Sequence, residues 1–428
     1  MTAQMEDEQT RVGVVGLGYV GLPLALAMHD AGYDVVGVDI DADKVEGLRA
    51  GESPVNDVTD EEVWTATRNG LTFTTDYSLL SDADGVSIAV PTPLRKTDTP
   101  DLSFVLDAAE RLATVVPEDC TVVLESTVYP GATEGALADV LAENGATIGE
   151  DLYLAFSPER IDPGNEEYGP TDIPKVLGGV TEECGDRAQA LYEPVFDEVV
   201  RVDSATEAEL VKLLENTFRA VNIGLINELA QIAHELDVDI WDAIDAAETK
   251  PFGFMPFYPG PGLGGHCIPI DPFYLSWKAN EHGVDTRFID LADTVNREMP
   301  QHVVQRIVSQ LNDHGTAVST ADVLIIGAAY KPDVSDTRES PAIDIVEGLT
   351  GWDATVDYHD PYVPALDIGE TTYESVPLTD DRLRSADCVV IVTDHSPLDF
   401  DRIVEEASLV FDTRNATSHR DDEHVVRL

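Results

Sequence analysis

A glycine-rich turn near the amino terminus constrains the fold more than any other feature of the sequence. The segment from Arg11 reads RVGVVGLGYVGLPLALAMHDAGYDVVGVDID: an apolar strand, the turn, a helical apolar pattern and a second strand that ends at Asp39. This order predicts a βαβ unit. The glycines of its GxGxxG turn, Gly16, Gly18 and Gly21, would let the backbone approach a pyrophosphate at the helix N-terminus.

The cofactor that we expect in this unit is NAD. A carboxylate at Asp39 would accept hydrogen bonds from ribose hydroxyls and repel the 2′-phosphate of NADP. Tyr19 and Val20 complete the turn. The alternative for Asp39 is a solvated turn residue that follows a strand.

Further strand candidates lie at 85–90, 121–126 and 152–157, with helical stretches between them. They predict a mostly parallel, doubly wound sheet in the first part of the chain. From about Ser204 the sequence has helical periodicity. A loop dense in glycine and proline interrupts it, and the helical pattern then resumes to about Asn312.

The last part of the chain echoes the first. A strand and turn begin at Ala321, a later strand ends at Asp360, and RSADCVVIVTDH resembles the earlier SDADGVSIAVPT. We therefore predict an α/β protein with two Rossmann-like doubly wound parallel-sheet domains joined by a central helical region. The alternative is a chance similarity between two generic α/β units. The expected domains are 1–200 for NAD binding, 201–312 for the helical and dimerisation region, and 313–428 for the second nucleotide-binding half.

The charge of the chain excludes two classes of partner. Asp and Glu number 82 against 26 Lys and Arg, which gives a formal net charge of −56, while 43% of the residues are hydrophobic. So acidic a surface argues against binding to nucleic acid or to an anionic membrane. Only seven of the basic residues are lysines. Many carboxylates with few lysines are typical of a protein that works in multimolar salt, where screening weakens self-repulsion.

No targeting or metal-binding pattern is visible. The acidic start MTAQMEDEQT has no basic or apolar leader region, and no apolar run approaches the ~18 residues of a membrane span, so we expect a cytoplasmic protein. The four cysteines are far apart and form no CxxC pair, which makes a zinc site or a disulfide framework improbable.

One cysteine lies in a setting that suits chemistry. Cys267 follows the glycine run of GLGGHC, and Asp271 follows four residues later. A thiol there can approach a substrate carbon closely, and the carboxylate could orient a water or a hydroxyl. A buried structural cysteine is the alternative, and His266 is more often a packing residue than a base.

Polar residues also recur on one predicted helix. Lys212, Asn216 and Arg219 follow Glu209 and are spaced to share one face. Such a stripe is usually a solvated surface. Lysine is so rare in this chain, however, that one retained among apolar neighbours favours a specific task.

The sequence resembles the UDP-glucose/GDP-mannose dehydrogenase family, whose members oxidise C6 of a nucleotide sugar to a carboxylate with two NAD. The resemblance runs from Arg11 to about Asn415. It is carried by GLGYVGLPLA, VPTP at 90–93, ESTVYPG at 125–131, FSPERIDPGN at 156–165, ELVKLLENTFRAVNIGLINE at 209–228, GPGLGGHCIPIDPFYL at 260–275 and AAYKPDVSDTRESP at 328–341.

The resemblance implies roles for individual residues. Cys267 is the implied nucleophile, with Lys212, Asn216 and Asp271 beside it, and the residues implied in proton handling are Thr127 and Glu159. Cofactor contacts are implied for Gly16, Gly18, Tyr19, Val20, Gly21, Asp39, Lys44, Thr92, Thr127 and Arg338. Contacts with a UDP-sugar substrate are implied for Arg160, Ile161, Lys212, Asn216, Arg219, Gly264, Tyr330, Lys331 and Arg414.

Within the family, the loops at 156–165 and 250–279 look most like the branch that acts on UDP-N-acetylhexosamines, with UDP-N-acetylglucosamine favoured and UDP-N-acetylmannosamine next. The glucose branch typically has a second glutamate four residues after the position of Glu159. This chain has Pro163 there, which speaks against UDP-glucose.

Three alternatives remain. One is a UDP-glucose 6-dehydrogenase, and another is a single-step β-hydroxyacid dehydrogenase, which needs neither a nucleophilic cysteine nor a second nucleotide-binding half. The third is a catalytically silent NAD-binding regulator. We also expect a homodimer or larger assembly on the helix predicted from Ala205 to Leu236, by resemblance and because its apolar positions spread beyond one face.

Overall fold

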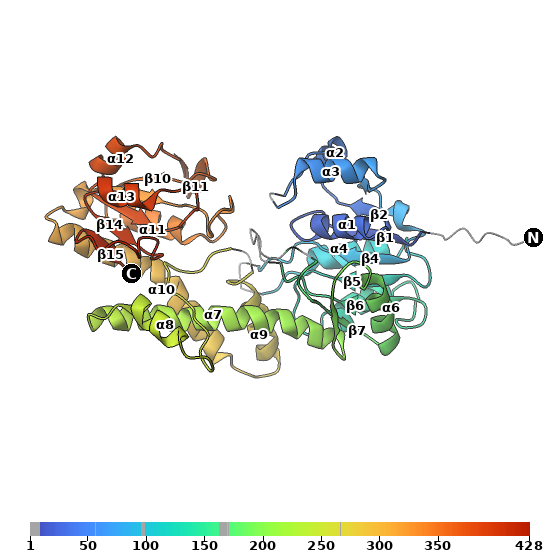
Figure 1. Ribbon diagram of the computed structural model, residues 1–428. Coiled ribbons are helices and arrows are strands. Elements are labelled where there is room, and N and C mark those ends of the chain that lie inside the picture. Colours follow the sequence, from blue (N-terminus) through green and yellow to red (C-terminus); the bar gives the residue numbers. More distant parts are fainter. Residues whose placement is uncertain (1–8, 56, 96–98, 162–168, 170, 266) are drawn as a thin grey trace, which may run out of the picture. The chain divides into compact units, whose positions relative to one another are not determined.

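The computed structural model describes residues 9–428 except 56, 96–98, 162–168, 170 and 266. Its contacts divide the chain into two compact units (Figure 1). The first unit comprises 1–215 and 273–284, and the second comprises 216–272 and 285–428. No helix in the described residues is both long and apolar enough to cross a membrane.

The first unit is built on an eight-stranded sheet. Its strand order is β3-β2-β1-β4-β5-β6-β7-β8, and neighbouring strands are parallel except for β6 and β7. The predicted, mostly parallel sheet is therefore confirmed. The strands are β1 (Arg11–Val15), β2 (Asp34–Val38), β3 (Thr72–Thr74), β4 (Gly85–Ile88), β5 (Thr121–Leu124), β6 (Tyr153–Phe156), β7 (Lys175–Gly179) and β8 (Val199–Arg201).

Helices of the first unit pack their apolar faces on this sheet. One buried cluster joins side chains of α1, α2, α3 and α6 to strands β1, β2 and β3. Burial of these aliphatic side chains supplies the main favourable contribution to folding of the unit. The helices are α1 (Gly21–Asp30), α2 (Ala42–Ala50), α3 (Asp60–Arg68), α4 (Ser103–Leu112), α5 (Ala138–Leu141) and α6 (Glu182–Tyr192), with short turns η1 (Tyr77–Leu80) and η2 (Thr133–Leu137).

Long helices fill the middle of the chain. Helix α7 (Ala205–Glu235) begins in the first unit and continues into the second, and it confirms the long helix expected from the sequence. Helix α8 (Ile240–Glu248) and α9 (Asp271–Glu281) lie on either side of the loop that carries Cys267. Helix α10 (Arg287–Asp313) contains Pro300 and is followed by η3 (Val318–Thr320).

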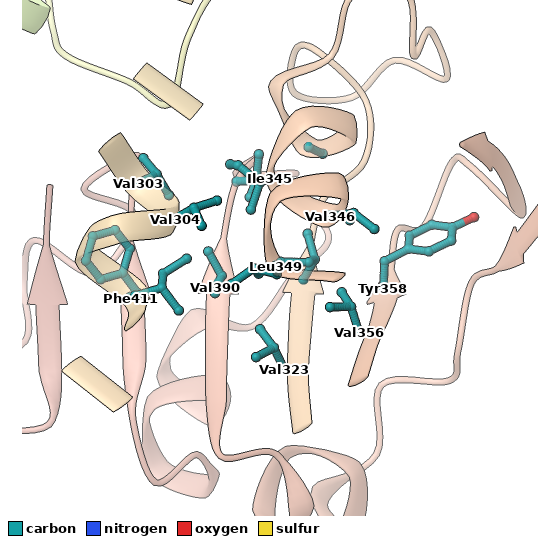
Figure 2. Close-up of a cluster of buried hydrophobic side chains, with 14 of the residues drawn as sticks. Val303, Val304, Val323, Ile345, Val346, Leu349, Val356, Tyr358, Val390 and Phe411 are labelled. Carbon is teal, nitrogen blue, oxygen red and sulfur yellow. The ribbon is translucent and has the colours of Figure 1, made fainter. Parts of the chain in front are cut away.

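The second unit has a five-stranded, wholly parallel sheet in the order β10-β9-β13-β14-β15. Figure 2 shows its core, in which Val303 and Val304 of α10, Ile345 and Leu349 of α11, and Val390 of β13 come together. The elements are β9 (Asp322–Ile326), α11 (Pro341–Thr350), β10 (Thr355–His359), the hairpin β11 (Ala365–Ile368) and β12 (Thr371–Glu374), α12 (Asp380–Ser385), β13 (Cys388–Ile391), α13 (Phe400–Glu406), β14 (Val410–Asp412) and β15 (Val425–Arg427).

The two sheets repeat one local arrangement, as the sequence echo predicts. Each first strand ends in a glycine with positive φ, Gly16 at +92° and Gly327 at +88°. Each second strand is followed by an aspartate whose carboxylate accepts an amide N–H from the turn after the first strand. Asp39 accepts from Leu17, and Asp360 accepts from Ala328 and the residue after it.

Candidate functional site

The glycine turn after β1 leaves one face of the backbone open. A Cβ on Gly16 would collide with the carbonyl of Ala89, and a Cβ on Gly21 would collide with the carbonyl of Gly16. Gly18 differs, because no atom lies within 4 Å of the position that its Cβ would occupy. Two glycines thus close the turn tightly, and the third leaves space for a ligand to reach the backbone at the start of α1. These features fit the pyrophosphate of a dinucleotide.

Asp39 lies at the carboxyl end of β2 and is buried. Its carboxylate accepts hydrogen bonds from the amides of Leu17 at 2.9 Å and Asp41 at 3.0 Å, and from Nζ of Lys44 at 2.8 Å. Burial raises the pKa of Asp39, but these hydrogen bonds outweigh burial and hold the pKa below its ordinary value. The structure therefore brings two of the implied cofactor residues into an ion pair.

The loop after β5 carries Thr127 and is held at both ends. Ser126 donates from its hydroxyl to the carbonyl of Val90 at 2.7 Å. The carboxylate of Glu209, buried on α7, accepts the amide N–H groups of Gly131 at 2.5 Å and Thr133 at 2.8 Å. Burial raises the pKa of Glu209 to about 7, even though these hydrogen bonds lower it. Thr92, in the loop after β4, accepts the hydroxyl of Tyr274 on its carbonyl at 2.8 Å.

Glu159, just beyond β6, has a tightly fixed carboxylate. Its Oε1 accepts the amide N–H groups of Arg160 at 2.6 Å and Ile161 at 2.8 Å, and its Oε2 accepts from Nζ of Lys175 at 3.1 Å. Burial raises the pKa of Glu159, but the charge and hydrogen bond of Lys175 together with the two amides lower it overall. Glu159 is therefore ionised near neutral pH.

Two of the implied substrate residues of the first unit have different surroundings. The guanidinium of Arg160 forms a two-pronged ion pair with Glu215, with Nη2 to Oε1 at 2.6 Å, and donates from Nη1 to the carbonyl of Pro174. Lys212 on α7 is only 9% exposed. Within the described residues of the first unit, no carboxylate forms an ion pair with its ammonium group. A buried cation without a partner is costly unless a ligand provides the charge.

The second unit holds the cysteine loop. Cys267 is exposed, whereas Cys120, Cys184 and Cys388 are buried. Burial raises the pKa of both the Cys120 and the Cys388 thiol to about 12. The carbonyl of Cys267 accepts the amide N–H of Asp271 at 2.8 Å, so the cysteine lies one turn before α9. Cys267 is thus the exposed one of the four cysteines, contrary to the buried structural alternative.

Asn216 and Asp271 meet in the same unit. Nδ2 of Asn216 donates to Oδ2 of Asp271 at 2.5 Å, which joins α7 to the first turn of α9. Arg219, three residues further along α7, is exposed. The structure therefore places a carboxylate and an amide next to the helical turn that follows the accessible thiol.

The glycine run before Cys267 lies against loops that follow strands of the second sheet. A Cβ on Gly264 would lie 2.6 Å from Cβ of Tyr330, and the amide of Gly265 donates to the carbonyl of Arg338 at 2.9 Å. A Cβ on Gly260 would lie 2.8 Å from Nη1 of Arg414. A side chain at position 264 would overlap Cβ of Tyr330, so the close approach there needs glycine. Within the second unit, the loop thus lies beside Tyr330, Arg338 and Arg414.

The remaining implied residues are placed as follows within their own units. Lys331 follows Tyr330 in the loop after β9, and Arg338 pairs with Asp336 at 2.5 Å while its side chain stays half exposed. Tyr19 is exposed beside the first glycine turn. Pro163 lies outside the described residues. Sequence reasoning missed Lys175, Glu125 and Tyr192, which are buried together. Glu125 opens the ESTVYPG motif, but no spacing in the sequence links it to Lys175 or Tyr192.

Comparison with known proteins gives a consistent result. Models of the UDP-glucose/GDP-mannose dehydrogenase family match in three segments: the NAD binding domain over 10–196, the central domain over 206–298 and the UDP binding domain over 324–419. These segments include the glycine turn, the cysteine loop and the loop of Tyr330.

Relatives match over most of the chain. A UDP-N-acetyl-D-mannosamine dehydrogenase of Methanococcus maripaludis is 34% identical, covering 96% of this chain and 93% of the relative. A UDP-N-acetyl-D-glucosamine 6-dehydrogenase of Pseudomonas aeruginosa is 38% identical, covering 83% of this chain and 84% of the relative. A solved structure of a UDP-D-ManNAc dehydrogenase from Pyrococcus horikoshii superimposes with a TM-score of 0.89 at 32% identity, covering 98% of this chain and 99% of that one.

Proposed function

The chain belongs to the UDP-glucose/GDP-mannose dehydrogenase family, a family of NAD-dependent oxidoreductases, and from this premise we propose that it oxidises C6 of a UDP-N-acetylhexosamine to the carboxylate. The observation that carries the proposal is the exposed thiol of Cys267, one helical turn before the Asp271 carboxylate that Asn216 holds. A single-step dehydrogenase or a silent NAD-binding protein has no use for this group.

The cofactor in the proposal is NAD. The open backbone at Gly18 and the start of α1 would hold its pyrophosphate, and Asp39 would hold the adenosine ribose. Because Asp39 is kept ionised, a 2′-phosphate would meet a fixed negative charge, which favours NAD over NADP. When bound, NAD supplies the acceptor for each hydride that leaves the substrate carbon.

Two oxidations at one carbon need a trap for the aldehyde between them. The thiolate of Cys267 adds to the aldehyde carbon and forms a thiohemiacetal, which the second oxidation converts to a thioester. Water then displaces the thiolate and releases the acid. The whole reaction consumes the primary alcohol, two NAD⁺ and one water, and yields the carboxylate, two NADH and three protons.

Residues of each unit supply charge and proton transfer in this proposal. Lys212 and Asn216 stabilise the oxyanions that develop at C6, and the buried ammonium of Lys212, which forms no ion pair within the described residues of its unit, suits that task. Asp271 orients the reacting hydroxyl or water. Glu159 and Thr127 handle protons, and the ionised state of Glu159 suits a proton acceptor.

The UDP part of the substrate needs cations in an otherwise acidic protein. We assign its diphosphate to Lys331 and Arg338, and its remaining contacts to Tyr330 and Arg414, which surround the glycine run of the cysteine loop. Gly264 gives the sugar access to the backbone. The further contacts that we propose are those of Arg160, Ile161 and Arg219.

UDP-N-acetylglucosamine is the favoured substrate in the proposal, and UDP-N-acetylmannosamine is the second candidate, since relatives of both names cover the chain. The purified enzyme should be assayed for NADH formation with each of these sugars and with UDP-glucose. Turnover of an N-acetylhexosamine at least tenfold faster than UDP-glucose, by kcat/KM, is expected. Preference for UDP-glucose would refute the branch assignment, and no turnover with any of the three would refute the proposal.

A further inference from the structure

Three ionisable side chains from separate parts of the first unit form a buried ion cluster: Glu125, Lys175 and Glu159. Nζ of Lys175 lies 2.7 Å from Oε2 of Glu125 and 3.1 Å from Oε2 of Glu159. The side chain of Lys175 is 4% exposed, that of Glu125 is 0% exposed and that of Glu159 is 15% exposed. Neither Lys175 nor Glu125 has a role in the oxidation steps of the proposed function.

The surroundings of Lys175 leave its ammonium little freedom. Its Nζ lies 5.2 Å from the ring centroid of Phe196 and 5.9 Å from that of Tyr192, both at the carboxyl end of α6 or just beyond it. The hydroxyl of Tyr192 donates to Oε1 of Glu125 and forms a second hydrogen bond with Ser87 at 2.8 Å. Glu125 is therefore held from both sides, and it holds Lys175 in turn.

The two carboxylates of the cluster differ in a way that matters for chemistry. Burial raises the pKa of Glu125 above its ordinary value, whereas the ammonium and two amides lower that of Glu159. Glu159 is also the partly exposed member, so it is the one that a ligand can reach.

We propose that Lys175 is a positioning residue for Glu159: its ammonium group fixes the direction of the Glu159 carboxylate and places a positive charge beside it, while Glu125 anchors Lys175. This inference rests on the proposed role of Glu159 in proton handling. In the part of the chain that the structure describes, the contacts that orient Glu159 come from two backbone amides and from this ammonium group. Removing the Lys175 ammonium group leaves the two amide hydrogen bonds to Glu159 in place but removes the positive charge beside its carboxylate.

The groups that face Glu159 define the expected pH effect. Lys175 on β7 contacts Glu159, and Glu125 after β5 contacts Lys175. Arg160 contacts Glu159 through its backbone amide, while its guanidinium is paired with Glu215 of α7. Lys175 is the cation that contacts the Glu159 carboxylate directly. Loss of that cation should raise the pKa of Glu159 by about one pH unit or more.

The test uses a charge-balanced double variant, Lys175→Met/Glu125→Gln, because Lys175→Met alone leaves two buried carboxylates unpaired and can fail to fold. In the double variant, the midpoint of the acidic limb of the pH profile of kcat/KM should shift to higher pH by about one unit. At pH values below this limb kcat/KM should be about tenfold lower than in the wild type, and at pH values above it kcat/KM should match the wild type. The single variant Lys175→Arg keeps the positive charge and should therefore show the acidic limb at the same pH as the wild type. Tyr192→Phe removes a hydroxyl from the far side of Glu125 and should leave the limb in place.

A loss of kcat/KM that is equal at every pH, with the limb unmoved, would overturn the inference and leave Lys175 a structural residue. A second measurement does not depend on turnover. The ¹³C carboxyl signal of Glu159, assigned with Glu159→Gln, should titrate at higher pH in the double variant than in the wild type. An unchanged titration refutes the inference, whereas absence of NADH formation by the wild type refutes the proposed function instead.

Discussion

Asn216 donates a hydrogen bond to Asp271 over 2.5 Å, although 55 positions separate the two residues in the chain. The amide of Asp271 in turn donates to the carbonyl of Cys267 at 2.8 Å. The hydrogen bond from Asn216 fixes the Asp271 carboxylate. The backbone hydrogen bond joins Asp271 to Cys267, the residue that bears the thiol. Asn216 and Asp271 are thus expected to act as one unit beside Cys267.

Because the two side chains act together, their removal should not be additive. Asn216→Ala and Asp271→Ala should each lower kcat about 100-fold, since each disturbs the same oriented carboxylate. The double variant should lose clearly less than the product of the two single losses. A double-mutant cycle on kcat at saturating substrate measures this coupling, and losses that simply multiply would show that the two residues act independently.

Asp39 sets the cofactor preference. Asp39→Ala should weaken NAD about tenfold and narrow the discrimination against NADP, because the ribose loses its acceptor and a 2′-phosphate no longer meets a carboxylate. Lys44→Met is the matched control, since it removes the partner of Asp39 and leaves the carboxylate. That variant should discriminate against NADP at least as strongly as the wild type. The measurement is KM for NAD and for NADP in the wild type and in both variants. An unchanged preference for NAD over NADP in Asp39→Ala would place the ribose contact elsewhere.

An apolar stripe on α7 predicts the assembly state. Phe218, Leu225, Leu229 and Ile232 are exposed along one side of the helix, at spacings of three, four and seven residues. We propose that a second copy of the chain covers them. Light scattering of the wild type should give about twice the 46.4 kDa of one chain, and Leu225→Glu/Ile232→Glu should give a monomer.

The control for the stripe is Trp352→Glu, an exposed apolar residue on a different element, which should leave the assembly unchanged. A wild-type monomer at high salt would contradict the proposed dimer. A dimer that survives the double substitution would place its interface away from α7.

The acidity of the chain predicts dependence on salt. With a formal charge of −56, the folded protein should repel itself at low ionic strength, where the Debye length is about 30 Å at 0.01 M against about 3 Å at 1 M. Activity and helical circular dichroism should therefore rise together as KCl increases from 0.05 to 3 M. A flat profile in both signals would mean that the acidity serves solubility alone.

Local patterns were sufficient to predict the main elements. The strand, glycine turn and helix that begin at Arg11, the long helix from Ala205 and the second parallel sheet all depend on short-range periodicity, and the structure confirms them. The hairpin of β11 and β12 and the short strand β15 were not predicted, because each is only three or four residues long and its neighbours decide its conformation.

Side-chain partnerships were harder to predict. Lys175 meets Glu125 and Glu159 because β5, β6 and β7 lie side by side in the sheet, and no sequence spacing shows this. The contact of Asn216 with Asp271 likewise depends on how α7 meets the start of α9. The sequence indicated which residues carry chemistry, whereas their partners followed from the fold.

The count of NADH formed per molecule of substrate tests the central claim most directly. With limiting UDP-N-acetylglucosamine or UDP-N-acetylmannosamine and excess NAD, the wild type should form two NADH per sugar consumed. Cys388→Ser, which alters a buried thiol, should keep that ratio, whereas Cys267→Ser should bind the sugar but not complete the second oxidation, so it should form at most one NADH per sugar. A ratio of one for the wild type, or a ratio of two for Cys267→Ser, would contradict oxidation through a thioester on Cys267.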